Sequence, residues 1–377
     1  MKVDLGGTVR DRDASSTLAW VQPFLRDFGI TRLANVTGLD CIGIPVWMCI
    51  RPNGRTLSVS QGKGVTADLA KASAIMESVE LYHAERIAPP DLVASYRTVY
   101  RRHSAIDPRR LEPGTRGRAY SPTREIAWIT GTDVGSGEPV LVPHARLNMN
   151  WSEVHPDTGL FMATSSGLAS GNLRSEALCH AIFEAIERHA DWRWERLSDG
   201  ACHSRELDPD TIDSPMLRQL LDQCARAGVM VRMWDFTSEV AVPSYACEIS
   251  GGGPPGSLGP YGGTGCHLSK EIALARAITE AVQSRLTVIS GSRDDMFFSE
   301  YAPKADQAPK DSLATPTLSF RERRSPRLGA TFDDDLRTTL RLLADAGFPR
   351  VVAVDHTRPE FGIPVVAVVV PGLHEAA

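Results

Sequence analysis

Residues 60–85, SQGKGVTADLAKASAIMESVELYHAE, contain the pattern on which the interpretation of the fold depends. A glycine-rich turn leads into a segment in which Ser73, Glu77 and Glu80 are spaced as i, i+4 and i+7. These positions share one face of an α-helix, next to a stripe of alanine and aliphatic residues. A single Glu-x-x-Glu pair usually belongs to a solvated edge of an amphipathic helix. One copy therefore indicates no function.

The pattern occurs three times, each time after a glycine-rich stretch. The second copy lies in LRSEALCHAIFEAIERHADWRWE (residues 173–195), and the third lies in EIALARAITEAVQSR (residues 271–285). The equivalent positions are Ser73, Glu77 and Glu80 in the first copy, His180, Glu184 and Glu187 in the second, and Arg276, Glu280 and Gln283 in the third. Helices so rich in alanine pack closely, which would bury their carboxylates. Three copies favour functional carboxylates over a solvated helix edge.

Composition excludes several classes of protein. The 377 residues are 42% hydrophobic and 23% charged, as in a folded soluble enzyme, and a net charge of −5 provides no basic field for nucleic acid. No apolar run is long enough to span a bilayer, and the start MKVDLGGTVRDRD lacks the apolar segment of a signal peptide. Seven cysteines without a Cys-x-x-Cys pair fit a reducing compartment. We expect a cytoplasmic protein with no nucleic-acid or membrane partner.

Alternating apolar residues predict strands around the three helices. The expected strand regions are residues 29–60 (two or three antiparallel strands), 126–147 (a hairpin around GSGEP), 242–250, 350–357 and 363–372. Residues 292–333 are rich in charge, proline and serine, and we expect them to form a long surface excursion that orders with a partner. The pattern predicts a mixed α/β fold.

The carboxylates and glycines together indicate a type of ligand. Carboxylates held close together in a partly buried place resist ionisation unless a cation lies among them. Oxygen ligands without histidine or cysteine clusters favour Mg²⁺, which usually shares its coordination with nucleotide phosphates. Glycine-rich turns before helices offer N–H groups to phosphate, and Lys63 adds a charge. QGKG is not a P-loop, and GPYGGTG is not a dinucleotide fingerprint. We therefore expect a Mg-nucleotide site outside the standard nucleotide folds.

The three blocks SQGKGVTADLAKASAIMESVE, SSGLASGNLRSEALCHAIFEAIERH and ALARAITEAVQSR resemble the signature blocks of the YcaO superfamily. Members of that superfamily are ATP-dependent enzymes that activate peptide backbone amides. The resemblance runs from about Gly7 to Leu373. It implies an α/β (α+β) fold in which pseudo-repeated helix and strand units enclose a non-standard Mg-ATP site. It also implies a single domain over residues 1–377, with a strand-rich segment at 1–60 and a core at 60–377.

The resemblance also implies a set of site residues, carried over position by position. The Mg²⁺ ligands would be Glu77, Glu80, Glu184 and Glu187. The ATP-binding residues would be Arg10, Thr17, Lys63, Ser73, Asn172, Glu176, His180, Arg276, Glu280 and Arg285. Glutamine at position 283 suggests that the third block does not bind metal as the first two do. The resemblance assigns no catalytic residue.

Two further stretches resemble the branch of the superfamily that works with a TfuA partner protein. They are GITRLANVTGLDCIGIPVW near the start and DHTRPEFGIPVVAVVVPGL near the end. This branch implies thioamide formation from a peptide substrate, a sulfide donor and a TfuA-like protein, and we expect a homodimer. The azoline-forming branch commonly ends in PxPxP, whereas this chain ends VVVPGLHEAA. An azoline-forming cyclodehydratase and a non-catalytic accessory factor for ribosomal-protein methylthiolation are the alternatives.

Overall fold

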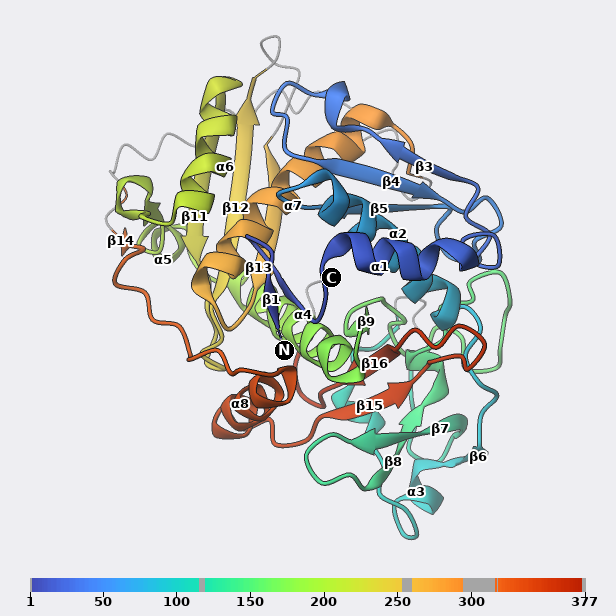
Figure 1. Ribbon diagram of the computed structural model, residues 1–377. Coiled ribbons are helices and arrows are strands. Elements are labelled where there is room, and N and C mark those ends of the chain that lie inside the picture. Colours follow the sequence, from blue (N-terminus) through green and yellow to red (C-terminus); the bar gives the residue numbers. More distant parts are fainter. Residues whose placement is uncertain (1, 115–118, 253–259, 294–315, 317, 375–377) are drawn as a thin grey trace. The chain divides into compact units, whose positions relative to one another are not determined.

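The computed structural model describes residues 2–114, 119–252, 260–293, 316 and 318–374 (Figure 1). The chain forms two compact units, and each is assembled from separate stretches of sequence. The first unit comprises Met1–Asn53, Leu57–Ser78 and Arg193–Ala330, and the second comprises Gly54–Thr56, Val79–Trp192 and Thr331–Ala377. Most of the excursion expected at residues 292–333 lies outside the described residues. The single domain over residues 1–377 stays a prediction.

The strands and α-helices of the first unit begin at the N-terminus and resume after the middle of the chain. In chain order they are β1 (Val3–Asp4), β2 (Val9–Arg10), α1 (Ala14–Val21), β3 (Arg32–Asn35), β4 (Val46–Ile50), β5 (Val59–Lys63), the part of α2 (Ala67–Ala84) up to Ser78, α5 (Asp199–His203), β10 (Leu207–Asp208), α6 (Pro215–Arg226), β11 (Val229–Asp235), β12 (Ser244–Gly251), β13 (Tyr261–Cys266), α7 (Lys270–Ser290) and β14 (Leu318–Ser319).

The first unit contains one strand–helix arrangement twice. The antiparallel sheet β3–β4–β5 is followed by α2, and the antiparallel sheet β11–β12–β13 is followed by α7. Helix α7 packs on β12 and β13, as Figure 1 shows. The strands predicted at residues 29–60 and 242–250 are confirmed, as are the helices of the first and third blocks. These two repeats correspond to the first and third of the three repeated blocks that the sequence predicted, and the second block lies on a helix of the second unit.

Both repeats bring a strand glycine against the backbone of the following helix. A Cβ atom on Gly62 would come within 3.0 Å of Ala70 O and Ala74 N. A Cβ atom on Gly265 would come equally close to Ala273 O and Ala277 N, at the same sequence spacing. Such contact requires glycine on the strand and alanine on the helix. The glycine-rich turns and alanine-rich helices of the sequence therefore belong to one packing arrangement.

The second unit is built on a single sheet. Its elements are β6 (Leu92–Ser95), α3 (Tyr96–Val99), β7 (Glu125–Asp133), β8 (Pro139–Pro143), β9 (Leu168–Ser170), α4 (Arg174–Trp194, which leaves the unit after Trp192), α8 (Phe332–Asp345), β15 (Val352–Asp355) and β16 (Val365–Val369), together with the end of α2. The strand order is β6–β7–β15–β16–β9, with β8 paired to β7, and all pairs are antiparallel. The predicted hairpin and the two late strands are confirmed.

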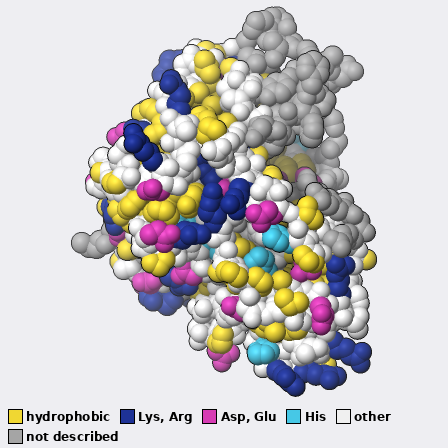
Figure 2. Space-filling model, turned by 90° about the vertical axis from the view of Figure 1, so that its right-hand side faces the viewer, with side chains coloured by type: hydrophobic (Ala, Val, Ile, Leu, Met, Phe, Trp, Pro, Cys, Tyr) yellow, Lys and Arg dark blue, Asp and Glu magenta, His cyan; other side chains and the backbone are white. Residues whose placement is uncertain are grey.

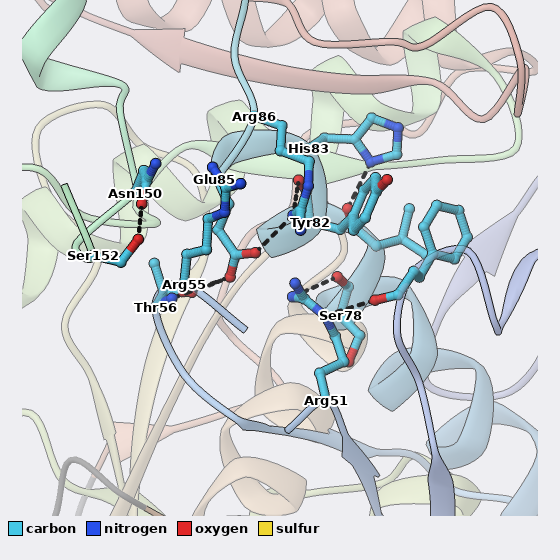
Figure 3. Close-up of polar contacts among 12 residues, drawn as sticks. Arg51, Arg55, Thr56, Ser78, Tyr82, His83, Glu85, Arg86, Asn150 and Ser152 are labelled. Carbon is cyan, nitrogen blue, oxygen red and sulfur yellow. Dashed lines mark hydrogen bonds and ion pairs between the residues drawn. The ribbon is translucent and has the colours of Figure 1, made fainter. Parts of the chain in front are cut away.

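The buried carboxylate of Glu85 follows the C-terminal end of α2 in the second unit. Glu85 Oε1 accepts hydrogen bonds from the N–H of Thr56 (3.2 Å) and from its hydroxyl (2.7 Å), and Glu85 Oε2 accepts from Arg86 (3.0 Å) (Figure 3). Glu85 is 1% exposed, so these donors replace the water that an exposed carboxylate would bind. These hydrogen bonds hold the short segment at residues 54–56 against the end of α2.

Replacing Thr56 by valine should lower the free energy of unfolding by about 1–3 kcal/mol, because a buried carboxylate loses its hydroxyl donor while the shape of the side chain is kept. Chemical denaturation measures the change. Thr130→Val is the matched control, since Thr130 is exposed on β7, and it should change stability by less than about 0.5 kcal/mol. Equal effects of the two substitutions would contradict this account of Glu85.

The described surface is mixed in character. On the face shown in Figure 2, basic, acidic and hydrophobic side chains are intermingled. Such mixing is typical of a protein whose positive and negative residues are nearly balanced in number. Among the described residues, no helix is both long enough and apolar enough to cross a membrane.

Candidate functional site

One carboxylate from each repeat of the first unit is held by the main chain. Glu77 Oε2 accepts a hydrogen bond from the N–H of Gln61 (3.1 Å), and Glu280 Oε1 accepts one from the N–H of Thr264 (3.5 Å). Each donor directly precedes the strand glycine that touches the helix. The same main-chain group therefore holds the equivalent carboxylate in both repeats.

A lysine joins the two repeats at this position. Lys63, the last residue of β5, forms an ion pair with Glu280 Oε2, and the two side chains are 17% and 21% exposed. The hydroxyl of Thr264 lies 3.5 Å from the other oxygen of Glu280. The resemblance placed both Lys63 and Glu280 at the nucleotide, and the structure brings them into contact although they are far apart in sequence.

Glu77 resists ionisation in this environment. Burial raises the pKa of its carboxyl from 4.5 to about 7. The N–H of Gln61 and the positive charges of Arg293 and Lys63 oppose this increase in the pKa, whereas the negative charge of Glu280 adds to it. The charges of Lys63 and Glu280 both act on Glu77, and carboxylate oxygens are the donors that suit a hard divalent cation such as Mg²⁺. The chemistry of these groups fits the metal that the sequence implied.

Several cationic side chains lie close to one another near Arg276, which precedes Glu280 by one turn of α7. Arg276 Nε is buried and has no hydrogen-bond partner among the described residues. Burial lowers the pKa of the neighbouring His267, and together with the charges of Arg276, Arg10 and Lys2 it brings this pKa to about 3. A buried donor among several cations fits an anionic group such as phosphate. The predicted residues Arg10 and Arg276 therefore act on the same imidazole.

The N-terminal hairpin carries Arg10 to this place. Strands β1 and β2 pair so that Val3 lies opposite Arg10. A Cβ atom on Gly7, in the turn, would lie 3.0 Å from Val65 Cγ1 and 3.7 Å from Ala275 Cβ. The hairpin therefore packs against the beginning of α7, next to Arg276.

Three other predicted residues of the first unit have different surroundings. Arg285 is fully buried, and its guanidinium donates to both oxygens of Asp40 (2.8 and 3.0 Å) and to the carbonyl of Gly251 (2.6 Å). It thus ties α7 to two distant segments of the unit. Thr17 is buried and its hydroxyl donates to Asp13 O (3.2 Å), and Ser73 is exposed on α2. The ATP-binding roles of these three residues stay predictions.

In the second unit, predicted residues gather at the turn between β9 and α4. Glu80 Oε1 accepts hydrogen bonds from the N–H (2.8 Å) and the hydroxyl (2.6 Å) of Ser170. Two residues later, the side-chain amide of Asn172 donates to both oxygens of Glu176 (3.3 Å each). Glu176 is 2% exposed. Glu80, Asn172 and Glu176 therefore lie around one glycine-containing turn.

Helix α4 continues this series of polar residues. Glu176, His180, Glu184 and Glu187 share one face of the helix, as the spacing predicted. Of the four predicted metal carboxylates, Glu187 is buried (2% exposed), and Glu77, Glu80 and Glu184 are partly buried. Within the described part of the chain, no group of three or more His, Cys, Asp or Glu side chains is arranged to hold a metal ion. Glu77 belongs to the first unit and the other three to the second, so their convergence stays a prediction.

Four residues that were not predicted from the sequence contact or influence these carboxylates. They are Gln61, Thr264, Ser170 and Arg293. The first three each precede a glycine of the three glycine-rich stretches, so that adjacency was a usable signal. Arg293 follows the end of α7 and belongs to no pattern in the sequence.

Comparison with known proteins identifies relatives of the whole chain. The family model of YcaO cyclodehydratases, described as ATP- and Mg²⁺-binding, matches residues 61–374. A protein encoded in the tfuA 3′ region of Rhizobium leguminosarum bv. trifolii is 34% identical over 95% of this chain and 87% of its own. A protein of Methanothermobacter thermautotrophicus is 35% identical over 95% of this chain and 93% of its own.

Solved structures share the fold. YcaO from Methanopyrus kandleri, bound with AMPPCP and Mg²⁺, matches with a TM-score of 0.74 and 22% identity, covering 98% of this chain and 94% of that one. A heterocyclase in complex with substrate and cofactor matches with a TM-score of 0.79 and 21% identity. The match covers 97% of this chain but about half (53%) of the heterocyclase. The predicted fold class, mixed helix and strand of the YcaO type, is confirmed.

Proposed function

Because the chain belongs to the YcaO family, we propose that it uses ATP and Mg²⁺ to activate a peptide backbone amide by phosphorylating the amide oxygen. The observation that carries this proposal is the pair of equivalent carboxylates, Glu77 and Glu280, each held by a main-chain N–H group, with Lys63 paired to Glu280 and acting on Glu77 through its charge. An oxygen-only donor set beside Lys63 and Arg276 suits a metal ion bound to a polyphosphate.

Each group of residues has a role in this proposal. Glu77, Glu80, Glu184 and Glu187 would hold Mg²⁺, which neutralises phosphate charge when bound. The triphosphate would lie against the cationic side chains of the first unit, and Asn172, Glu176 and His180 would complete the nucleotide site from the second. These cationic side chains are those of Lys63, Arg10 and Arg276. Fixed positive charge would stabilise the phosphoryl group during transfer.

The chemistry explains why ATP is needed. An amide oxygen is a poor leaving group, so a sulfide that adds to the carbonyl carbon is normally expelled again. Transfer of the γ-phosphoryl group to that oxygen releases ADP. Elimination of the oxygen as phosphate then forms the carbon–sulfur double bond. The net reaction converts an amide, a hydrosulfide ion and ATP into a thioamide, ADP and phosphate.

Thioamide formation with a TfuA-like partner is the form of this reaction that we propose. The support is the relative encoded in the tfuA 3′ region. The second candidate is azoline formation, in which a Cys, Ser or Thr side chain of the peptide is the nucleophile, and the family description as cyclodehydratase supports it. A non-catalytic accessory factor is the third, but it would have no need for Glu77 and Glu187 in buried or partly buried positions. We further propose a homodimer in the cytoplasm.

A reconstituted reaction tests the proposal. Purified protein, a TfuA-like protein, substrate peptide, sulfide and Mg-ATP should yield ADP, phosphate and a peptide whose mass has risen by the exchange of oxygen for sulfur. A mass loss of one water would indicate an azoline. Glu184→Gln should stop product formation, whereas Glu195→Gln, an exposed residue just beyond α4, should not. Unchanged product formation by Glu184→Gln, or no binding of millimolar Mg-ATP, would contradict the proposal.

A further inference from the structure

Strand β6 leaves one edge of the sheet in the second unit open. Among the described strands its partner is β7, with Val93 opposite Ala127 (Figure 1). The N–H of Ala127 donates to Asp157 Oδ2 (2.7 Å), so Val93 and Ala127 do not exchange hydrogen bonds with each other. In an antiparallel pair of this kind, both residues turn their N–H and C=O groups away from the partner strand. The N–H and C=O of Val93 therefore point outward from the sheet.

The centre of this edge is apolar. The side chain of Val93 is 61% exposed, whereas Leu92 and Ala94 pack against the apolar cluster around Trp128. Proteins usually protect an open strand edge with charged side chains or proline, and the four residues of β6 include neither. An edge with outward main-chain groups and an exposed valine is suited to accept a further strand.

A cluster of cationic side chains follows β6 directly. It consists of Arg97 in α3 and of Arg101 and Arg102 just beyond that helix, and we call it the arginine cluster. All three side chains are exposed, and none of them forms an ion pair with another described residue. Residues 91–110 contain five arginines and two aspartates, although the whole chain has a net charge of −5. Local positive charge on an acidic protein favours an acidic partner.

On the basis of the proposed function, we propose that β6 and the arginine cluster bind an extended, acidic segment of the peptide substrate, apart from the amide that is modified. The segment would add to β6 as a further strand and form hydrogen bonds with the N–H and C=O of Val93. Its acidic side chains would meet the arginine cluster at the end of the strand, beyond Ser95.

The chemistry of this edge favours a substrate peptide over other occupants. An amide oxygen can be phosphorylated only when it is not hydrogen-bonded within secondary structure, so a substrate of this class is extended when it reacts. Nucleic acid has no peptide groups with which to complete a strand. Pairing through the four residues of β6 alone would bury much less surface than a stable dimer requires.

The first test measures binding of a defined probe, a fluorescein-labelled synthetic peptide of alternating valine and glutamate. Its affinity for the wild-type protein should fall as the salt concentration rises, because ion pairs with exposed arginines are screened. Hydrogen exchange of residues 91–96, followed by mass spectrometry, should slow when the peptide is bound. A peptide of alternating valine and lysine is the control, and it should bind at least about tenfold more weakly.

The second test removes the main-chain donor of the edge. Val93→Pro deletes the outward N–H and should weaken binding of the acidic peptide about tenfold. Proline is tolerated on an edge strand where the N–H faces solvent, and circular dichroism would establish that the variant is folded. Val93→Thr keeps the N–H, and it should bind the peptide as the wild type does.

The third test removes the charge. Arg101→Glu combined with Arg102→Glu should weaken binding of the acidic peptide at least about tenfold. Arg337→Glu combined with Arg341→Glu makes the same change in net charge on the exposed face of α8, and it should leave the affinity unchanged. None of these positions belongs to the proposed ATP or Mg²⁺ site.

The outcomes separate this inference from the proposed function. Equal binding of the acidic and basic peptides, or of the acidic peptide by Val93→Pro and Val93→Thr, would overturn the inference and leave the proposed function standing. Displacement of the peptide by a TfuA-like protein would also overturn it, as would a dimer that dissociates in Val93→Pro, because each assigns the edge to another occupant. If the wild type binds the peptide but not Mg-ATP, the proposed function fails, and the assignment of the segment to a substrate fails with it.

Discussion

Glu77→Gln should abolish the thermal stabilisation that Mg-ATP gives to the protein. A ligand that binds the folded state raises the melting temperature by mass action, and Mg-ATP should do so more than ATP with EDTA. Glutamine retains the acceptor for the N–H of Gln61 but is a much poorer ligand for Mg²⁺. We expect the affinity for Mg-ATP to fall at least about a hundredfold, the result of losing a charged metal ligand.

Differential scanning fluorimetry with Mg-ATP and with ATP plus EDTA checks this expectation. Asp68→Asn, an exposed carboxylate in the first turn of the same helix, is the matched control and should keep the full shift. The role assigned to Glu77 would be wrong if Glu77→Gln kept a shift equal to that of the control.

The same variant should also change how the ligand-free protein responds to pH. Burial raises the pKa of Glu77 to about 7 in the folded state, above its ordinary 4.5, so the folded protein holds this proton more tightly than the unfolded chain does. This contribution to the free energy of unfolding is complete below pH 4.5 and is lost as the pH rises to about 7. The loss is on the order of 3 kcal/mol. Denaturation at several pH values should show a shallower decline for Glu77→Gln than for the wild type.

Gly62→Ala should destabilise the first unit severely, by at least about 4 kcal/mol, and the protein should then be largely unfolded at 37 °C. The new methyl group would meet the main-chain atoms Ala70 O and Ala74 N, which have no rotamer by which to move aside. Gly265→Ala should have a similar effect in the second repeat, because it meets the equivalent atoms Ala273 O and Ala277 N. Both effects act through the packing of a strand on a helix.

Chemical denaturation and circular dichroism measure these changes. Gly38→Ala is the control: no atom lies within 4 Å of the added Cβ, and the backbone at Gly38 is not in the left-handed region. It should change stability by less than about 1 kcal/mol. A well-folded Gly62→Ala protein would show that the strand and helix do not pack as closely as described.

The repeated blocks could be read from the sequence because their determinants are local. Glycine before a helix, alanine within it and the spacing of Glu77 and Glu80 are all set by residues close together in the chain. The same local rules identified the hairpin of β7 and β8 and the apolar strand β16. Pseudo-repetition followed from comparing three such local patterns.

The contacts between the blocks could not be read in this way. Lys63 meets Glu280, and Asp40 meets Arg285, only because two sheets with particular registers lie on two particular helices. A sequence pattern contains no information on which of several charges will be neighbours across such a distance. The hydrogen bond to Glu77 could not be predicted for another reason. Its donor is the main-chain N–H of Gln61, which every residue except proline has, so the residue type at position 61 does not indicate it.

That main-chain donor has a consequence for how the two repeats could diverge. Substitution at position 61 or 264 changes a side chain but leaves the N–H in place, unless the new residue is proline. The positions of Glu77 and Glu280 are therefore insulated from mutation at the residues that hold them. The residue after the strand glycine differs between the repeats, Lys63 in the first and Cys266 in the second, while the main-chain support of the carboxylate is the same. The two equivalent carboxylates therefore have the same support and different neighbours.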